Sequence, residues 1–174
     1  MTMNPARDLL VTGLRNAHGM EVQARQLMQR QCERLGDYPT VQTRLRQHLA
    51  ETIEQLHRLE KCLAACGETA SVIKDTLMSA FANLTAIGHA AADDEILKNT
   101  FANQAFENYE IAAYKSLITF CEQAGMPGLQ EPLQQSLAEE QRMAVWLDDH
   151  VEEVTLAYLT KKSAGARSGV SELT

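Results

Sequence analysis

Apolar residues recur at steps of three and four along most of the chain, the spacing that places side chains on one face of an α-helix. The first such series runs from about residue 5 to residue 35 and includes Leu10, Leu14, Met28 and Leu35. Glu21 stands in the middle of this series. The pattern therefore predicts a first helix over about residues 5–35, with one carboxylate on its otherwise apolar face.

Glycine and proline mark the boundaries of a second helix. Gly36 is followed by Asp37, Tyr38 and Pro39, a combination that ends one helix and opens the next. The second helix should run to about residue 66 and stop at Gly67. We expect the two helices to form an antiparallel hairpin.

The second half of the chain repeats this arrangement after a shorter amphipathic segment over about residues 71–91. Asp93 and Asp94 provide a cap for a long helix that Gly125 ends, and residues 127–132 form a turn. The last apolar stripe runs from Leu133 to Tyr158 and is interrupted by Glu140. Residues 163–174 are small and polar, so we predict a flexible tail there.

These elements define an all-α fold, because no alternating strand pattern competes with them. We predict a four-helix bundle domain over residues 1–162, made of two antiparallel hairpins. The connection between the hairpins crosses over the bundle and contains the short helix.

The composition limits which binding partners and which cellular compartment we expect for the protein. The chain has 174 residues, 45% of them hydrophobic, and a formal net charge of −7, which argues against nucleic acids and anionic membranes as partners. Neither a membrane-spanning run nor an export signal is recognisable in the sequence. The four cysteines form no CxxC pair, so we expect reduced, buried thiols in a cytoplasmic protein.

Four acidic residues are placed symmetrically about the two predicted turns. An offset of 89 residues superimposes the acidic pair of one hairpin on that of the other, and each member is fifteen residues from the glycine of its own turn: Glu21, Glu51, Glu110 and Glu140. At about 1.5 Å of rise per residue, all four should lie at one level of the bundle. Buried carboxylates are costly unless a cation compensates them, so this pattern favours a di-iron or di-manganese site.

The second helix leaves an alternative open. Its clearest stripe of leucines leaves Glu51 about 100° from the nearest stripe member, Thr52. Glu51 points inward only if His48, Glu51 and Gln55 form the inner face; otherwise His48 makes a structural hydrogen bond.

Two further residues precede the acidic ones by one helical step and could reach the same site, namely His18 and Glu107. The Glu-x-x-His pattern of complete dinuclear sites is broken, since Glu54 and Met143 occupy the histidine positions.

Several segments together resemble the YciE/YciF family of ferritin-superfamily stress proteins, most closely its YciE branch. The resemblance spans about residues 8–160 and rests on NAHGMEVQA, YPTVQTRLRQHLAETIEQL, SVIKD, DDEILKN, FENYEIAAYKSL and EEQRMAVWL. It implies a ferritin-like or rubrerythrin-like bundle, a cytoplasmic homodimer associated with general, osmotic or envelope stress. It also implies an acidic signature at Glu21, Glu51, Glu107, Glu110 and Glu140, while Ala144 stands where YciF-type members have an Asp.

Three functions are compatible with these observations. The first is a ferritin-like protein that binds iron or manganese through the buried carboxylates and handles oxygen or peroxide during stress. The second is a bundle without metal that acts through protein–protein contacts, which Met143 and Ala144 favour. The third, iron storage, needs a cage that nothing in the sequence specifies.

Overall fold

Four long helices make up the part of the chain that the computed structural model describes, residues 4–68 and 94–171, with side chains described up to residue 164. They are α1 (Pro5–Arg34), α2 (Pro39–Ala65), α4 (Glu95–Gln123) and α5 (Gln130–Ser171), with a 3₁₀ turn at Pro127–Leu129 before α5. The described residues contain no strand, which confirms the all-α prediction. The predicted short helix over residues 71–91 lies outside the described residues.

The helix ends follow from local chemistry. The Asn4 side chain accepts a hydrogen bond from the Ala6 amide at 3.2 Å, and Pro5 and Pro39 open α1 and α2. Gly67 (φ +89°) and Gly125 (φ +71°) follow the ends of α2 and α4 in the left-handed conformation that glycine adopts without strain.

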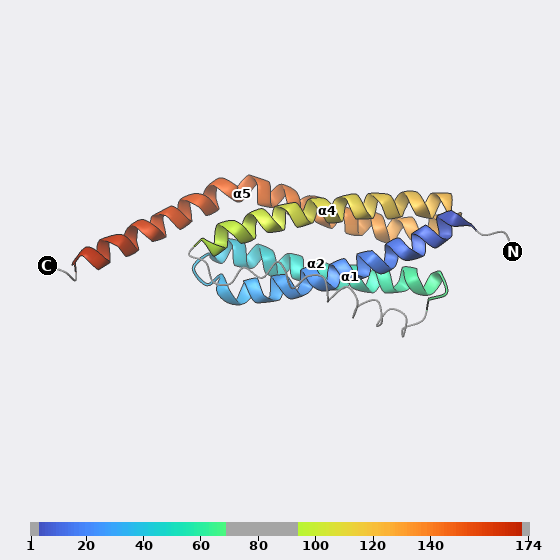
Figure 1. Cartoon of the computed structure of the whole chain (residues 1–174), viewed down its shortest axis with the longest axis horizontal. Helices are drawn as coiled ribbons and strands as arrows, with labels where there is room; N and C mark the ends of the chain where they lie inside the picture. Colours follow the sequence, from blue (N-terminus) through green and yellow to red (C-terminus); the bar gives the residue numbers. More distant parts are fainter. Residues whose placement is uncertain (1–3, 69–93, 172–174) are drawn as a thin grey trace.

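The four helices form two hairpins, α1 with α2 and α4 with α5 (Figure 1). The hairpins meet mainly through α1 against α4, and less closely through α2 against α5. One long side chain from each of the four helices can therefore reach the axis of the bundle at the same level.

Two separate apolar clusters fill the interior. One contains Leu10, Leu14, Leu63 and Leu117, and the other contains Met28, Leu45, Met143 and Leu147, each with further buried neighbours. All four cysteines are free and buried, and each belongs to one of these clusters. Between the clusters the interior is polar, with buried Glu, His, Thr and Gln side chains.

The last helix is longer than the apolar stripe predicts. α5 continues to Ser171, beyond the expected start of a tail at Ser163, and its end extends away from the bundle (Figure 1). No proline interrupts residues 133–171, so the backbone hydrogen bonds of the helix can continue where the apolar stripe has ended.

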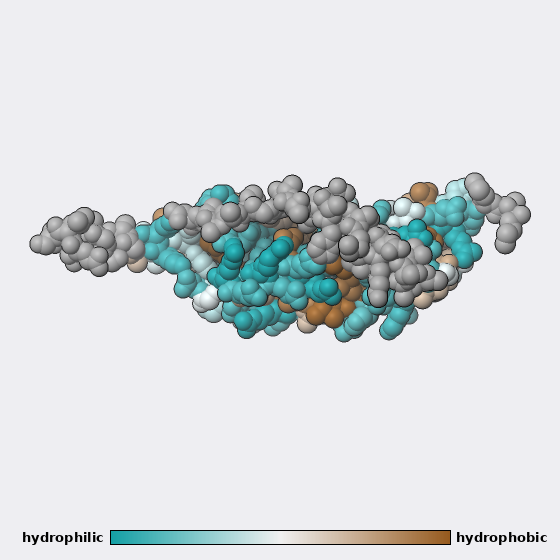
Figure 2. Space-filling model, turned by 60° about the horizontal axis from the view of Figure 1, so that its bottom comes forward, coloured by the Kyte–Doolittle hydropathy of each residue, from teal (hydrophilic) through white to brown (hydrophobic). Residues whose placement is uncertain are grey.

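On the face shown in Figure 2, hydrophilic side chains cover most of the coloured surface, beside a smaller hydrophobic patch. Within the described ranges, every helix is too polar or too short to cross a lipid bilayer.

Candidate metal centre

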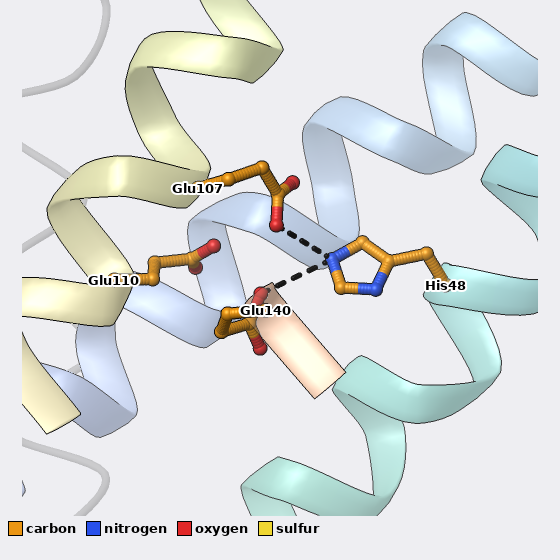
Figure 3. Close-up of side chains that lie close together, drawn as sticks. All are labelled: His48, Glu107, Glu110 and Glu140. Atoms are coloured by element: carbon orange, nitrogen blue, oxygen red, sulfur yellow. Dashed lines mark ion pairs between the residues drawn. The ribbon is translucent and has the colours of Figure 1, made fainter. Parts of the chain in front are cut away.

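Four buried side chains meet in the polar layer between the two apolar clusters. His48 comes from α2, Glu107 and Glu110 from α4, and Glu140 from α5, and one ligand atom of each lies within 4.8 Å of the others. Figure 3 shows the imidazole and the three carboxylates pointing toward one another. None of the four residues is more than 4% exposed.

Helical spacing explains why these residues meet. Glu107 and Glu110 are three residues apart, so both project from one face of α4. His48 follows Leu45 on the buried stripe of α2 and precedes Thr52, while Glu140 stands between buried residues of α5. Each helix thus presents polar groups at the height where its apolar stripe is interrupted.

His48 is held from both sides of its ring. Its Nε2 atom lies 3.1 Å from Glu107 Oε2 and 3.3 Å from Glu140 Oε2, drawn as dashed lines in Figure 3. Its Nδ1 atom lies 3.0 Å from Glu51 Oε2. Because a carboxylate accepts the Nδ1 hydrogen, the Nε2 atom is the one directed at the cluster.

Glu21 adds a fourth carboxylate beside the cluster. It is completely buried on α1, and the Tyr114 hydroxyl donates to its Oε1 atom at 2.6 Å. Burial and the charges of Glu140 and Glu107 raise its pKa well above the ordinary value, which shows how close these acids lie. Its other oxygen, Oε2, has no hydrogen-bond partner.

Two of the sequence-predicted ligands lie elsewhere. Glu51 is at the right height but at the edge of the bundle, with a quarter of its side chain exposed and with Arg44 and Arg142 at 3.5 and 3.4 Å. His18 is buried but turns toward α2, where its Nε2 atom lies 3.3 Å from Glu60 Oε1. The structure therefore brings together Glu21, Glu107, Glu110 and Glu140 and leaves Glu51 and His18 outside.

Three further residues support the cluster: Arg58 and Glu139, which were not predicted from the sequence, and Gln55, which was expected on the inner face only together with His48 and Glu51. Arg58 forms a two-point ion pair with Glu139, with N–O distances of 2.6 and 2.8 Å. Gln55 donates to Glu139 at 3.1 Å and also donates to Glu140 Oε1. This chain of contacts fixes the orientation of the Glu140 carboxylate. Gln55 belongs to the buried stripe of α2, a signal that was available in the sequence.

Burial dominates the electrostatics of the site. It raises the pKa of Glu107 from 4.5 to about 7, and it raises the pKa of Glu110 well above the ordinary value together with the charges of Glu21 and Glu140. Burial opposes the charged form of His48, but its hydrogen bonds to Glu107, Glu140 and Glu51 raise its pKa. Without a metal ion, the raised pKa values of Glu21, Glu107 and Glu110 favour retention of protons on these carboxylates near neutral pH.

The donor set fits a metal ion. Glu21 Oε2 and Glu110 Oε1 are buried oxygens without a hydrogen-bond partner among the described residues, and the buried Glu107 Oε2 and Glu140 Oε2 atoms face His48 Nε2 at 3.1 and 3.3 Å. Such atoms are uncommon in folded proteins, and each keeps a lone pair directed into the interior. Several carboxylates with one imidazole form the ligand set that iron and manganese accept.

These pKa shifts predict that the metal-free protein loses stability as pH rises from about 5 to 8. The acids with raised pKa values bind more protons in the folded than in the unfolded state within this window, so unfolding releases protons and a rising pH favours it. His48 acts in the same direction, since its stabilisation is lost as pH rises through its raised pKa. We expect a loss on the order of 1–3 kcal/mol, measured by urea unfolding at both pH values.

Saturating Mn(II) should reverse this trend, because metal binding displaces the same protons. A metal-free protein that is more stable at pH 8 than at pH 5 would contradict the assignment of buried, protonated carboxylates. Glu51, whose pKa is lowered by its hydrogen bond with His48, contributes in the opposite direction only at lower pH.

The chain is similar to one protein family and to proteins of known structure. The family described as a domain of unknown function, DUF892, matches residues 5–160. A protein of known structure from Xanthomonas campestris pv. campestris is 27% identical, with a TM-score of 0.76 over 91% of this chain and 99% of its own. The Escherichia coli stress protein YciF is 21% identical and has the same fold, with a TM-score of 0.67 over 88% of this chain and 98% of its own.

Proposed function

The chain belongs to the DUF892 family, whose description assigns no function, and from its buried side chains we propose that it binds a pair of iron or manganese ions inside the bundle. The observation that carries the proposal is the set of buried carboxylates around one imidazole, in which Glu21 Oε2 and Glu110 Oε1 have no hydrogen-bond partner among the described residues. We further propose that the bound metal handles oxygen or peroxide under stress.

Charge balance favours two ions over one. Glu21, Glu107, Glu110 and Glu140 carry four negative charges when ionised, and the Nε2 atom of a neutral His48 adds a ligand without charge. Two divalent ions neutralise this set, whereas one ion leaves two buried charges uncompensated, at a cost of several kcal/mol each.

The residues divide by position. His48, Glu107, Glu110 and Glu140 would hold the metal through the ligand atoms that meet in the cluster, and the buried Glu21 beside them would add a further carboxylate. When bound, iron or manganese supplies one-electron chemistry toward oxygen or peroxide. The protein contributes orientation and exclusion of water: Tyr114 fixes Glu21, Gln55 fixes Glu140, and Glu51 fixes His48.

Metal content of the wild-type chain tests the proposal directly. We expect about two ions per chain after anaerobic loading with Fe(II) or Mn(II), and about 2.7 kcal/mol of stabilisation at a free metal concentration of one hundred times Kd. A folded protein that takes up no metal and shows no change in Tm would reject it.

Replacing Glu51 by Gln should weaken metal binding without abolishing it. The change removes the charge that holds His48 through Nδ1, and loss of such a supporting contact typically lowers affinity roughly 10- to 100-fold. Titration with Mn(II) measures the effect. Glu54→Gln is the matched control, because Glu54 lies on the same helix with 65% of its side chain exposed. Equal Mn(II) affinities in both variants would show that Glu51 does not support metal binding.

The second candidate is a bundle that has lost metal binding and acts through protein contacts. Met143 and Ala144 favour it, because both are buried beside Glu140 at positions where further ligands could stand. In that case the raised pKa values of Glu107 and Glu110 keep these groups neutral in the folded protein. The metal titration separates the two candidates.

Placement in the ferritin superfamily and in the YciE branch is part of the same proposal, as are a cytoplasmic location and a homodimer. The four-helix arrangement with buried carboxylates on α1, α4 and α5 supports the superfamily placement. Sedimentation of the purified protein tests the homodimer.

A further inference from the structure

A small cavity lies between α1 and α4 beside the candidate metal centre. It has a volume of about 70 Å³ and is lined by Ala24, Met28, Ala102, Phe106 and Glu107, among others. Ala24, Met28 and Glu107 are buried, while Ala102 and Phe106 are half-buried. The cavity therefore extends from the side of the bundle to the polar layer.

Glu107 belongs both to this cavity and to the metal cluster. Its carboxylate contributes to the cavity lining, and its Oε2 atom lies 3.1 Å from His48 Nε2. A molecule in the cavity is thus one side chain away from the proposed metal position.

Size and polarity define what the cavity can accept. A water molecule takes about 30 Å³ in the liquid, so the space holds a guest of two or three heavy atoms. Ala24, Leu27, Met28, Ala102 and Phe106 form the apolar part of its wall, while Gln31, Asn99, Asn103 and Glu107 add polar groups. Apolar surfaces of this kind bind small apolar gases. The amides of Gln31 and Asn103, at its half-buried rim, bond to each other at 3.1 and 2.9 Å and do not need a polar guest.

The opposite side of the cluster suits such a guest less well. There, a groove of about 1140 Å³ between α2 and α5 is lined in part by Arg44 and Arg142. Both arginines contact Glu51, which in turn holds His48. This ion-pair network separates the groove from the buried carboxylates.

We propose that the cavity between α1 and α4 is the chamber through which an uncharged diatomic molecule, the size of dioxygen, reaches the metal centre. This inference rests on the proposed metal-binding function. It specifies the substrate class by size and charge and excludes bulky or charged substrates from this route.

Xenon provides the first test, in the metal-free protein. We expect saturable shifts of the Ala24 and Met28 methyl signals under xenon pressure in wild type. Ala102→Leu fills the cavity and should abolish these shifts. Ala112→Leu on the same helix is the matched control, because residue 112 is exposed, and should retain them. Ala24→Val gives a smaller filling change if Ala102→Leu does not fold.

Nitric oxide provides the second test, in the Fe(II)-loaded protein. Ala102→Leu should slow nitric oxide binding roughly tenfold, equivalent to about 1.4 kcal/mol in the barrier, with iron content unchanged. An unchanged rate overturns the inference, as does a wild type that binds iron but shows no xenon shifts. If wild type takes up no iron, the proposed function fails and the access role fails with it, whatever xenon shows.

Discussion

Replacing Glu110 by Gln is expected to abolish binding of the metal pair and at the same time to stabilise the metal-free protein. Glu110 is buried, and one of its oxygens has no hydrogen-bond partner among the described residues. Burial and the charges of Glu21 and Glu140 raise its pKa. The substitution removes an acid that is unfavourable in the metal-free fold, and it removes one of the carboxylates that would hold the metal.

Two melting experiments measure both effects. Metal-free Glu110→Gln should melt above metal-free wild type, by about 2–4 °C for each kcal/mol of repulsion relieved, and more clearly at pH 8 than at pH 5. Adding Mn(II) should raise the Tm of wild type and of the control but not that of Glu110→Gln. The control is Glu122→Gln, an exposed change on the same helix. A variant that is less stable without metal, or one that still binds two ions, would contradict the assignment.

Removal of Arg58 alone is expected to destabilise the bundle by about 3–5 kcal/mol, because it leaves the carboxylate of Glu139 buried without its counter-charge. Arg58 and Glu139 are 14% and 7% exposed, and the guanidinium also donates to Ser136 at 3.0 Å. We expect a fall in Tm of roughly 10 °C or more for Arg58→Met in the metal-free protein.

A loss of stability in Arg58→Met has two explanations, an unpaired charge on Glu139 or lost packing of the Arg58 stem. The double variant Arg58→Met, Glu139→Leu distinguishes them. Replacing both partners of a buried ion pair with apolar groups is often neutral or stabilising, so the double variant should recover most of the lost stability. If the double variant is as unstable as Arg58→Met, packing of the Arg58 stem explains the loss. If Arg58→Met costs less than about 1 kcal/mol, the pair behaves as a solvent-exposed ion pair.

The helices themselves could be predicted from local sequence. Prolines at residues 5 and 39 and glycines at residues 67 and 125 set their limits within a few residues, because φ preferences act on the chain without any tertiary partner. The end of α5 was the exception. An apolar stripe reports where a helix is buried, and it carries no information about a helix that continues past the bundle.

The position of the candidate site along the bundle could also be predicted from the sequence. The side chain that α2 contributes to it could not. Equal spacing from the two turns indicated the height at which Glu21, Glu110 and Glu140 lie, since helix rise is constant. Which side chain of α2 faces them depends on the rotation of that helix about its axis. Packing against α1 and α5 sets this rotation, so His48 and Gln55 point inward and Glu51 stands behind His48.

The sequence by itself determined the fold class, the hairpins and four of the buried acids, because helix period and turn chemistry are local properties. Only the tertiary structure decided that His48 joins the acids, that His18 pairs with Glu60, and that Arg58 and Glu139 support the site. These contacts join residues on different helices, and their geometry depends on the angles and distances at which whole helices pack.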